Sequence, residues 1–374
     1  LTQFVNNLKW SLGFNVQNSS YKNGTSFLRE NIFYETDLNF IKYGLFLKAS
    51  NNFFNQRLNI SLGIRTDADT FSTGSNLIDN FSPRFSFSYS LSEDQKWKFN
   101  ASIGRYFKIP TYTMLGFQNN LSVFVNKSSQ YAKSEHYVAG LEYNLTSVSR
   151  LTVEGFLKNY SQFPVSLIDG VSLANKGGGF EVLGNEAIQS LGEGKTSGLE
   201  FLFQQKLAKN FYGILAYTYF SSEFSGLDGI LRPSVWDSRH LISFSGGYKL
   251  RKNWEISARW RYAGKNPYVP VDINASTISY PEIILDYDTL GEFRLDAFNL
   301  ADIRIDKKWN FKNLSFNLYF EVQNFLAQPN PTPPEYGLNR NLDGTIIIPK
   351  NLVPVSNQEG NSSPLPTFGF VLFF

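Results

Sequence analysis

The sequence offers few side chains that could carry catalysis. Histidine occurs only 2 times and cysteine is absent, which excludes thiolate nucleophiles, disulfides and cysteine metal sites. The stretch "DSRH" over Asp237–His240 holds the three residue types of a serine-hydrolase triad. Consecutive strand residues point to opposite faces, so these side chains cannot converge on one substrate. We expect ion pairs and hydrogen bonds that anchor a strand end there, and no enzyme activity.

Other polar stretches could hold ligands, but their spacing favours loops. Asp67, Asp69 and Asp79 offer carboxylates for calcium but lack the EF-hand spacing. "NKGGGFEVLGN" at 175–185 lacks the Lys-Ser/Thr of a phosphate loop and predicts an external loop. His136 is expected at a strand end, with no metal ligands around it. Acidic residues near Arg294 predict local ion pairing, with capture of a cationic ligand as the alternative; they are Asp286, Asp288, Glu292 and Asp296. We expect no metal and no cofactor.

The elements that position these residues are strands. The 374 residues include 16% aromatic side chains, and hydrophobic residues make up 42%. No apolar run is long enough for a transmembrane helix, yet a membrane barrel remains open because its strands alternate in polarity. A net charge of +3 without a basic run gives no indication of nucleic-acid binding.

Alternation with period 2 runs through the chain. In "LNISLGIR" an apolar set, Leu58, Ile60, Leu62 and Ile64, opposes a polar set that ends in Arg65. We call these sides of the strands the apolar face and the polar face. The pattern predicts about fourteen strands. They lie near 6–17, 37–51, 55–66, 82–92, 95–107, 134–146, 149–161, 195–208, 210–222, 238–250, 253–264, 294–309, 312–325 and 365–374. Many are twice the usual length of strands in soluble domains, which disfavours the alternative of a secreted sandwich.

Short and long connections alternate along the chain, as in outer-membrane barrels. The long ones are predicted at 18–36, 67–81, 108–133, 162–194, 223–237, 265–293 and 326–364. Hydrocarbon offers backbone groups no partners, so the sheet must close on itself, with lipid on its apolar face. We therefore predict an all-β, transmembrane, antiparallel up-and-down β-barrel in one domain over residues 1–374.

This topology assigns roles to individual residues. On the polar face, the residues expected to face the lumen, a plug or the solute path are Arg65, Arg105, Arg259, Arg261 and Glu321. The loop aromatics expected to contact a ligand are Tyr112, Phe117, Tyr268 and Tyr336, with packing between loops as the alternative. In the final "LPTFGFVLFF", Phe368 to Phe374 are expected to face lipid, and Phe374 ends the strand that closes the barrel.

Several stretches resemble the C-terminal barrel of TonB-dependent outer-membrane transporters. They are "GEGKTSGLEFLFQQKLAKNFYGILAYTYFSSEF", "RPSVWDSRHLISFSGGYKLRKNWEISARWRYAGKNPYVP", "RLDAFNLADIRIDKKWNFKNLSFNLYFEVQNFLAQPNPTPPEY" and the closing "FGFVLFF". The resemblance is strong from about residue 190 to 374 and rests on pattern before that. It implies a 22-stranded barrel, of which this chain holds the C-terminal part, while a plug domain and the remaining strands lie elsewhere.

The resemblance also implies a function and partners. The expected function is import of a scarce, bulky nutrient across the outer membrane of a Gram-negative bacterium: a ferric siderophore, cobalamin, an oligosaccharide or a peptide. Expected partners are outer-membrane lipid, a TonB-type energising protein, the plug and the barrel assembly machinery, with a surface lipoprotein as a further candidate and no nucleic acid. Two alternatives stay open: a passive pore of about fourteen strands, and an adhesion or assembly component that binds a partner through its loops.

Overall fold

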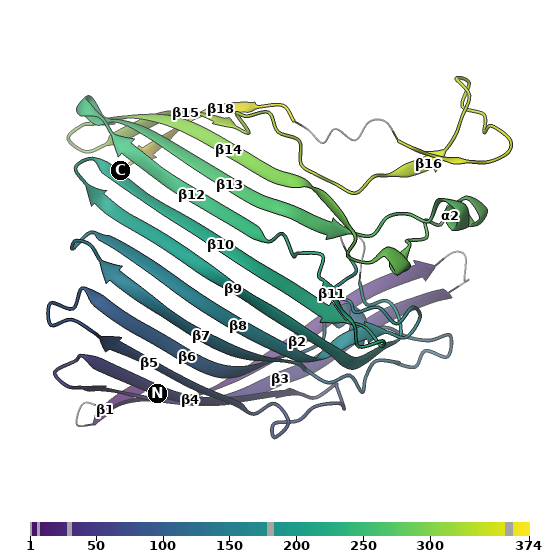
Figure 1. Cartoon of the computed structure of the whole chain (residues 1–374), viewed down its shortest axis with the longest axis horizontal. Helices are drawn as coiled ribbons and strands as arrows, with labels where there is room; N and C mark the ends of the chain where they lie inside the picture. The colour runs from purple at the N-terminus through teal and green to yellow at the C-terminus, as the bar shows by residue number, and fades with distance from the viewer. Residues whose placement is uncertain (1, 6–7, 28–31, 178–182, 356–361) are drawn as a thin grey trace. The chain divides into compact units, whose positions relative to one another are not determined.

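The computed structural model describes residues 2–5, 8–27, 32–177, 183–355 and 362–374 (Figure 1). The chain divides into two compact units. Unit 1 comprises Leu1–Tyr143, Val153–Leu199 and Ser221–Val235, and unit 2 comprises Asn144–Thr152, Glu200–Phe220 and Trp236–Phe374. The single domain expected over 1–374 stays a prediction. Within the described ranges, no helix is both long and apolar enough to cross a membrane.

Unit 1 is built on strands that follow one another in chain order. They are β1 (Thr2–Val5), β2 (Leu8–Phe27), β3 (Ile32–Phe53), β4 (Leu58–Asp69), β5 (Ser82–Ser90), β6 (Trp97–Lys108) and β7 (Ala132–Asn144), with most of β8 (Ser149–Ser166) and of β9 (Ile188–Ala208). From β1 to β7 each strand is antiparallel to the next. The short helix α1 (Tyr112–Leu115) lies in the connection from β6 to β7, and β11 (Leu231–Pro233) pairs with the end of β10.

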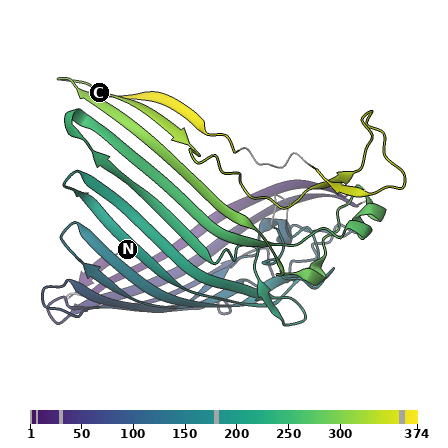
Figure 2. The ribbon, with the colours of Figure 1, turned by 45° about the horizontal axis from the view of Figure 1, so that its top comes forward.

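Unit 2 follows the same up-and-down rule. Its strands are β10 (Phe211–Ser225, to Phe220), β12 (His240–Lys249), β13 (Trp254–Tyr268), β14 (Phe293–Asn310), β15 (Ser315–Gln323) and β18 (Leu365–Phe373), paired antiparallel in this order. The β16–β17 hairpin (Tyr336–Leu338, Leu352–Pro354), α2 (Ile273–Ser279) and two 3-10 turns, η1 (Arg251–Asn253) and η2 (Tyr287–Thr289), complete it. Figure 2 shows α2 and the hairpin at the end of unit 2 that carries its long connections.

All fourteen predicted strands are present. The connections between them are short at one end, such as Lys209–Asn210, where φ values of +48° and +70° fit a tight two-residue turn between antiparallel strands. One prediction was wrong: most of the expected loop 18–36 is strand, because β2 and β3 stay paired from Lys9↔Ser50 to Phe27↔Ile32. The alternation of apolar and polar residues ends near residue 17. The backbone hydrogen bonds between β2 and β3 do not depend on that alternation, so the two strands stay paired beyond it.

The register confirms the two faces. Leu62 of β4 stands between Ala49 of β3 and Phe85 of β5, and its neighbour Ser61 stands between Ser50 and Ser86 on the other face. Apolar side chains remain exposed on the apolar face, including Leu62 at 57% and Phe368 at 83%. A water-soluble sheet would bury such a face against another layer. Exposed apolar rows over many strands are the arrangement that hydrocarbon stabilises.

The buried core of unit 1 lies at its long-loop end. Leu38 and Phe40 of β3 pack with Leu115 of α1 into a cluster that also contacts Tyr21 and Phe71. A second cluster joins Met114, Leu173 and Ile188. The long connections of this unit are thus packed against the polar face of its longest strands.

Candidate functional site: the polar face of the strands

Unit 2 carries a ladder of ion pairs on its polar face. Arg259 of β13 stands opposite Asp302 of β14, and its Nε and Nη2 lie 2.9 and 2.8 Å from Asp302 Oδ2. Arg304 makes two hydrogen bonds of 2.7 Å to Asp306. Such forked, charge-assisted bonds hold both partners in one geometry. Predicted residue Arg259 is therefore fixed by a neighbour that the sequence analysis did not name.

The predicted residue Glu321 belongs to the same ladder. Its Oε2 lies 3.8 Å from Arg304 Nη1, and the Arg304 guanidinium stacks 3.8 Å from the centre of the Tyr319 ring. The signal for Arg304 was present in "DIRID", where Asp302, Arg304 and Asp306 alternate and so share one face. Arg261 lies two residues after Arg259 on the polar face and is exposed. It lines a cavity of about 230 Å³ with amide side chains from β15 and from the connection that follows it.

In unit 1, Arg65 is also on the polar face, as predicted from the alternation. Its Nε and Nη2 each lie 2.6 Å from an Asp67 carboxylate oxygen, and Nη2 donates to Asn15 Oδ1 at 3.2 Å. Strands β2 and β4 flank β3, so this contact passes over Gly44, which stands opposite both Asn15 and Asp67. Glycine leaves the space that the arginine needs.

Beside Arg65 lies a cavity of about 450 Å³, which we call the basic pocket. Besides Arg65, its polar-face lining consists of Phe46 and Lys48 of β3, Ser61 and Gly63 of β4, Arg84 and Ser86 of β5, and Ser102 and Tyr106 of β6. The guanidinium carbon of Arg84 lies 4.3 Å from the centre of the Tyr106 ring. Sequence analysis did not single out Arg84 or Lys48 as site residues.

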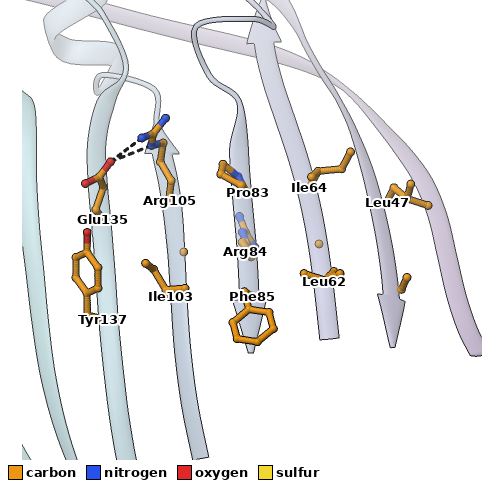
Figure 3. Close-up of a pocket in the computed structure, with 13 residues that line it drawn as sticks. Leu47, Leu62, Ile64, Pro83, Arg84, Phe85, Ile103, Arg105, Glu135 and Tyr137 are labelled. Carbon is orange, nitrogen blue, oxygen red and sulfur yellow. Dashed lines mark hydrogen bonds and ion pairs between the residues drawn. The ribbon is translucent and has the colours of Figure 1, made fainter. Parts of the chain in front are cut away.

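The prediction that Arg105 lies on the polar face was wrong. It shares the face of Ile103, the apolar face, and stands opposite Glu135 of β7. Arg105 Nη2 lies 2.8 Å from Glu135 Oε1 (Figure 3). Lys133 Nζ lies 3.1 Å from the same oxygen. The parity of β6 decides this position, because Arg105 follows Ile103 by two residues. Below the ion pair, an apolar groove of about 630 Å³ runs past Ile103, Phe85 and Leu62.

The predicted loop aromatics are packed against their own loops and strands. Tyr112 accepts a hydrogen bond from Lys42 Nζ at 2.8 Å, and its ring lies edge-on to Phe40. Phe117 meets Tyr34 edge to face, and Tyr268 lies against Phe293. Tyr336 is half-buried in β16, opposite Pro354. A ligand role for these residues stays a prediction, as does a role for Phe374, which follows β18 and is exposed.

The "DSRH" stretch forms the expected anchor at a strand end. Asp237 is fully buried, and its Oδ2 lies 2.9 Å from Arg239 Nε and 2.8 Å from Arg294 Nη2. Arg294 also donates to the Asp237 carbonyl oxygen at 2.6 Å. The expectation that Arg294 pairs with acidic residues in its own stretch was wrong. His240 makes a different contact: its Nδ1 lies 2.9 Å from the Tyr217 hydroxyl oxygen.

The loop acids are also occupied by protein donors. Asp69 accepts hydrogen bonds from the Ser72 hydroxyl at 2.6 Å and from the Tyr131 hydroxyl at 2.7 Å. Burial and then the bond to Asp69 raise the pKa of Tyr131 above its ordinary value. Among the residues that the structure places, no group of carboxylates and histidines could hold a metal ion. The glycine-rich stretch at 175–185 lies partly outside the described residues.

Known structures share this fold. FpvA of P. aeruginosa bound to heterologous pyoverdines has a TM-score of 0.59 at 15% identity, over 94% of this chain and 45% of its own. The ferric citrate transporter FecA in the unliganded form has a TM-score of 0.61 at 14% identity, over 100% and 53%. The copper transporter OprC has a TM-score of 0.60 at 14% identity, over 99% and 54%. The chain thus spans about half the length of these proteins.

The sequence itself also matches a known family. No curated protein matches the chain, but a family model described as "TonB dependent receptor-like, beta-barrel" matches residues 2–325. The match covers the strands from β1 to β15, so the alternation that predicts a membrane barrel and the family match agree. The chain is an all-β protein of the transmembrane barrel type and belongs to the TonB-dependent receptor-like β-barrel family.

Proposed function

We propose that this chain forms part of the barrel of an outer-membrane importer in a Gram-negative bacterium, energised through a TonB-type protein. The observation that carries the proposal is the division of the sheet into an apolar face and a polar face. Its apolar face exposes rows of apolar side chains such as Leu62 and Phe368, while its polar face carries ordered charges such as Arg259 and Asp302. A membrane wall that faces both lipid and an aqueous path requires this division. The family match supports the same function.

The proposed cargo is a scarce, bulky nutrient. Structures similar to this one are those of FpvA bound to pyoverdines, a ferric citrate transporter and a copper transporter. These relatives favour a metal or a metal chelate over cobalamin, an oligosaccharide or a peptide. The proposed path runs along the polar face, past Arg65, Arg259, Arg261 and Glu321. The proposed partners are a plug domain, the energising protein, the barrel assembly machinery and outer-membrane lipid.

Uptake in cells tests this proposal. Cells with and without the gene would be grown on a panel of ferric chelates and copper salts as the limiting metal source, with and without the energising protein. We expect a growth defect on one source only, reproduced when the energising protein is removed. Uptake that persists without energy, together with steady open channels of the purified chain in planar bilayers, would support a passive pore instead. Loss of partner binding on loop deletion with unchanged uptake would support an adhesion role.

A further inference from the structure

The basic pocket of unit 1 holds cations that lack carboxylate partners. Of the polar-face arginines in unit 2, Arg259 and Arg304 each pair with a carboxylate on the same face, whereas no described carboxylate pairs with Arg261. In the basic pocket only Arg65 does so, through Asp67. In the part of the chain that the structure describes, no carboxylate pairs with Lys48 or Arg84. The pocket therefore holds two cations whose charge is not neutralised within it.

The Arg84 side chain is held in place although its guanidinium lacks hydrogen-bond acceptors among the described residues. Its guanidinium stacks on the Tyr106 ring, and its Nε is buried and has no hydrogen-bond acceptor. Buried donors in proteins are nearly always paired, because an unpaired one loses its bonds to water without replacement. A guanidinium that is oriented by stacking and lacks an acceptor is prepared for an anion.

The remaining lining suits an anion with a flat, apolar body. Phe46 is an aromatic residue on a polar face, and it lies over Gly13 of β2. A Cβ atom at Gly13 would come within 2.4 Å of the Phe46 ring, so only glycine permits this ring position. Phe46 and Tyr106 offer ring surfaces, and Ser61, Ser86 and Ser102 offer hydroxyl groups.

We propose that the basic pocket binds a small organic oxyanion group, a carboxylate or phenolate on a flat apolar body, and that the imported solute carries such a group. This inference rests on the proposed function. The size of the cavity favours a small molecule over a single acidic side chain from another domain. Its volume of about 450 Å³ lies within the range of roughly 300–1,000 Å³ that ligand pockets usually have.

Binding of carboxyfluorescein, an anion that carries carboxylates and a flat xanthene ring, to the purified chain in neutral detergent tests the pocket by fluorescence anisotropy. We expect about tenfold weaker binding for Lys48→Gln or Arg84→Gln and about a hundredfold for the double variant, since each removes one charged hydrogen-bond donor. Lys108→Gln is the matched control, because Lys108 is exposed on the same face of β6 but does not line the pocket. Trimesate should compete with the probe, and the neutral benzene-1,3,5-tricarboxamide should not.

A second measurement needs no ligand. The chain has no cysteine, so Ser86→Cys and Ser88→Cys each introduce a single thiol on the polar face of β5. Ser86 lines the basic pocket and also the edge of a neighbouring depression, whereas Ser88 lines only that depression, which contains Glu154. We expect an anionic methanethiosulfonate to modify the thiol of Ser86→Cys about tenfold faster than a cationic one, relative to the same ratio for Ser88→Cys.

Three results would overturn the proposal. One is unchanged probe binding in the double variant, and another is equal weakening by Lys108→Gln, which would indicate a diffuse electrostatic effect. The third is protection of the Ser86→Cys thiol in cells together with its cross-linking to another segment of the receptor, which would assign the pocket to a protein contact. None of them depends on uptake, so energised import can stand while this inference fails.

Discussion

The facing of the strands can be tested by one arginine placed on either side of β4. Leu62 is the fifth residue of this strand, so at about 3.4 Å per residue it lies roughly 14 Å along the strand from Leu58. With a strand tilt of about 45° that is about 10 Å along the membrane normal, close to the middle of an apolar band about 25 Å tall. Leu62→Arg should therefore destabilise the folded barrel by about 2–4 kcal/mol, the cost of arginine on a lipid face at midplane.

Ser61→Arg is the matched control, one residue away on the polar face. Its new charge would lie near Lys48 and Arg65, which also line the basic pocket, and in water such repulsion costs about 1 kcal/mol or less. Urea unfolding of the protein in phospholipid vesicles, followed by tryptophan fluorescence, gives the free energy of unfolding for both variants. Equal losses for Leu62→Arg and Ser61→Arg would refute the assigned faces.

Two buried contacts at the loop ends make further predictions. Asp237→Ala should cost about 3–5 kcal/mol, because it leaves the cations of Arg239 and Arg294 without their shared anion; a loss below about 1 kcal/mol in urea unfolding would contradict this anchor. Tyr131→Phe should cost about 1.5–3 kcal/mol by removing the bond to Asp69, seen as faster hydrogen exchange in the connection 109–131. Since the pKa of Tyr131 is raised in the folded state, its contribution should be complete below about pH 10 and fall as the pH rises further. A titration in which Tyr131 ionises with the exposed tyrosines would speak against that contact.

The fold was predictable because alternation is a local signal. In β4 and β18 every second residue is apolar, and a strand has the same period, so element type and facing follow from the sequence together. The extension of β2 and β3 to Phe27 and Ile32 was missed because it depends on the backbone ladder between two strands. Polar residues occur on both faces of 18–27, so this segment has no periodic signal, yet its backbone pairs with β3 as well as that of an apolar segment would.

The candidate site was less predictable, since partners across strands depend on register. Arg259 was expected on the polar face, but its pairing with Asp302 follows from the alignment of β13 with β14. Arg105 was misplaced because residue type was given more weight than parity. A cation on the apolar face is tolerated there because Glu135 lies opposite it and because β6 ends three residues later, at Lys108.

Arginines on the polar face differ in whether a carboxylate pairs with them, and this difference sets how strongly each part of the polar face attracts an anionic solute. Where Arg304 is held by Asp306 and stacked on Tyr319, the charge is satisfied inside the sheet and contributes little attraction to a passing solute. Where Arg84 is stacked on Tyr106 but lacks an acceptor, orientation is kept and attraction remains. Removing Tyr106 should therefore weaken anion binding at the basic pocket without removing any charge. Tyr106→Leu with unchanged probe affinity would show that charge alone, and not the orientation of Arg84, makes the pocket attractive.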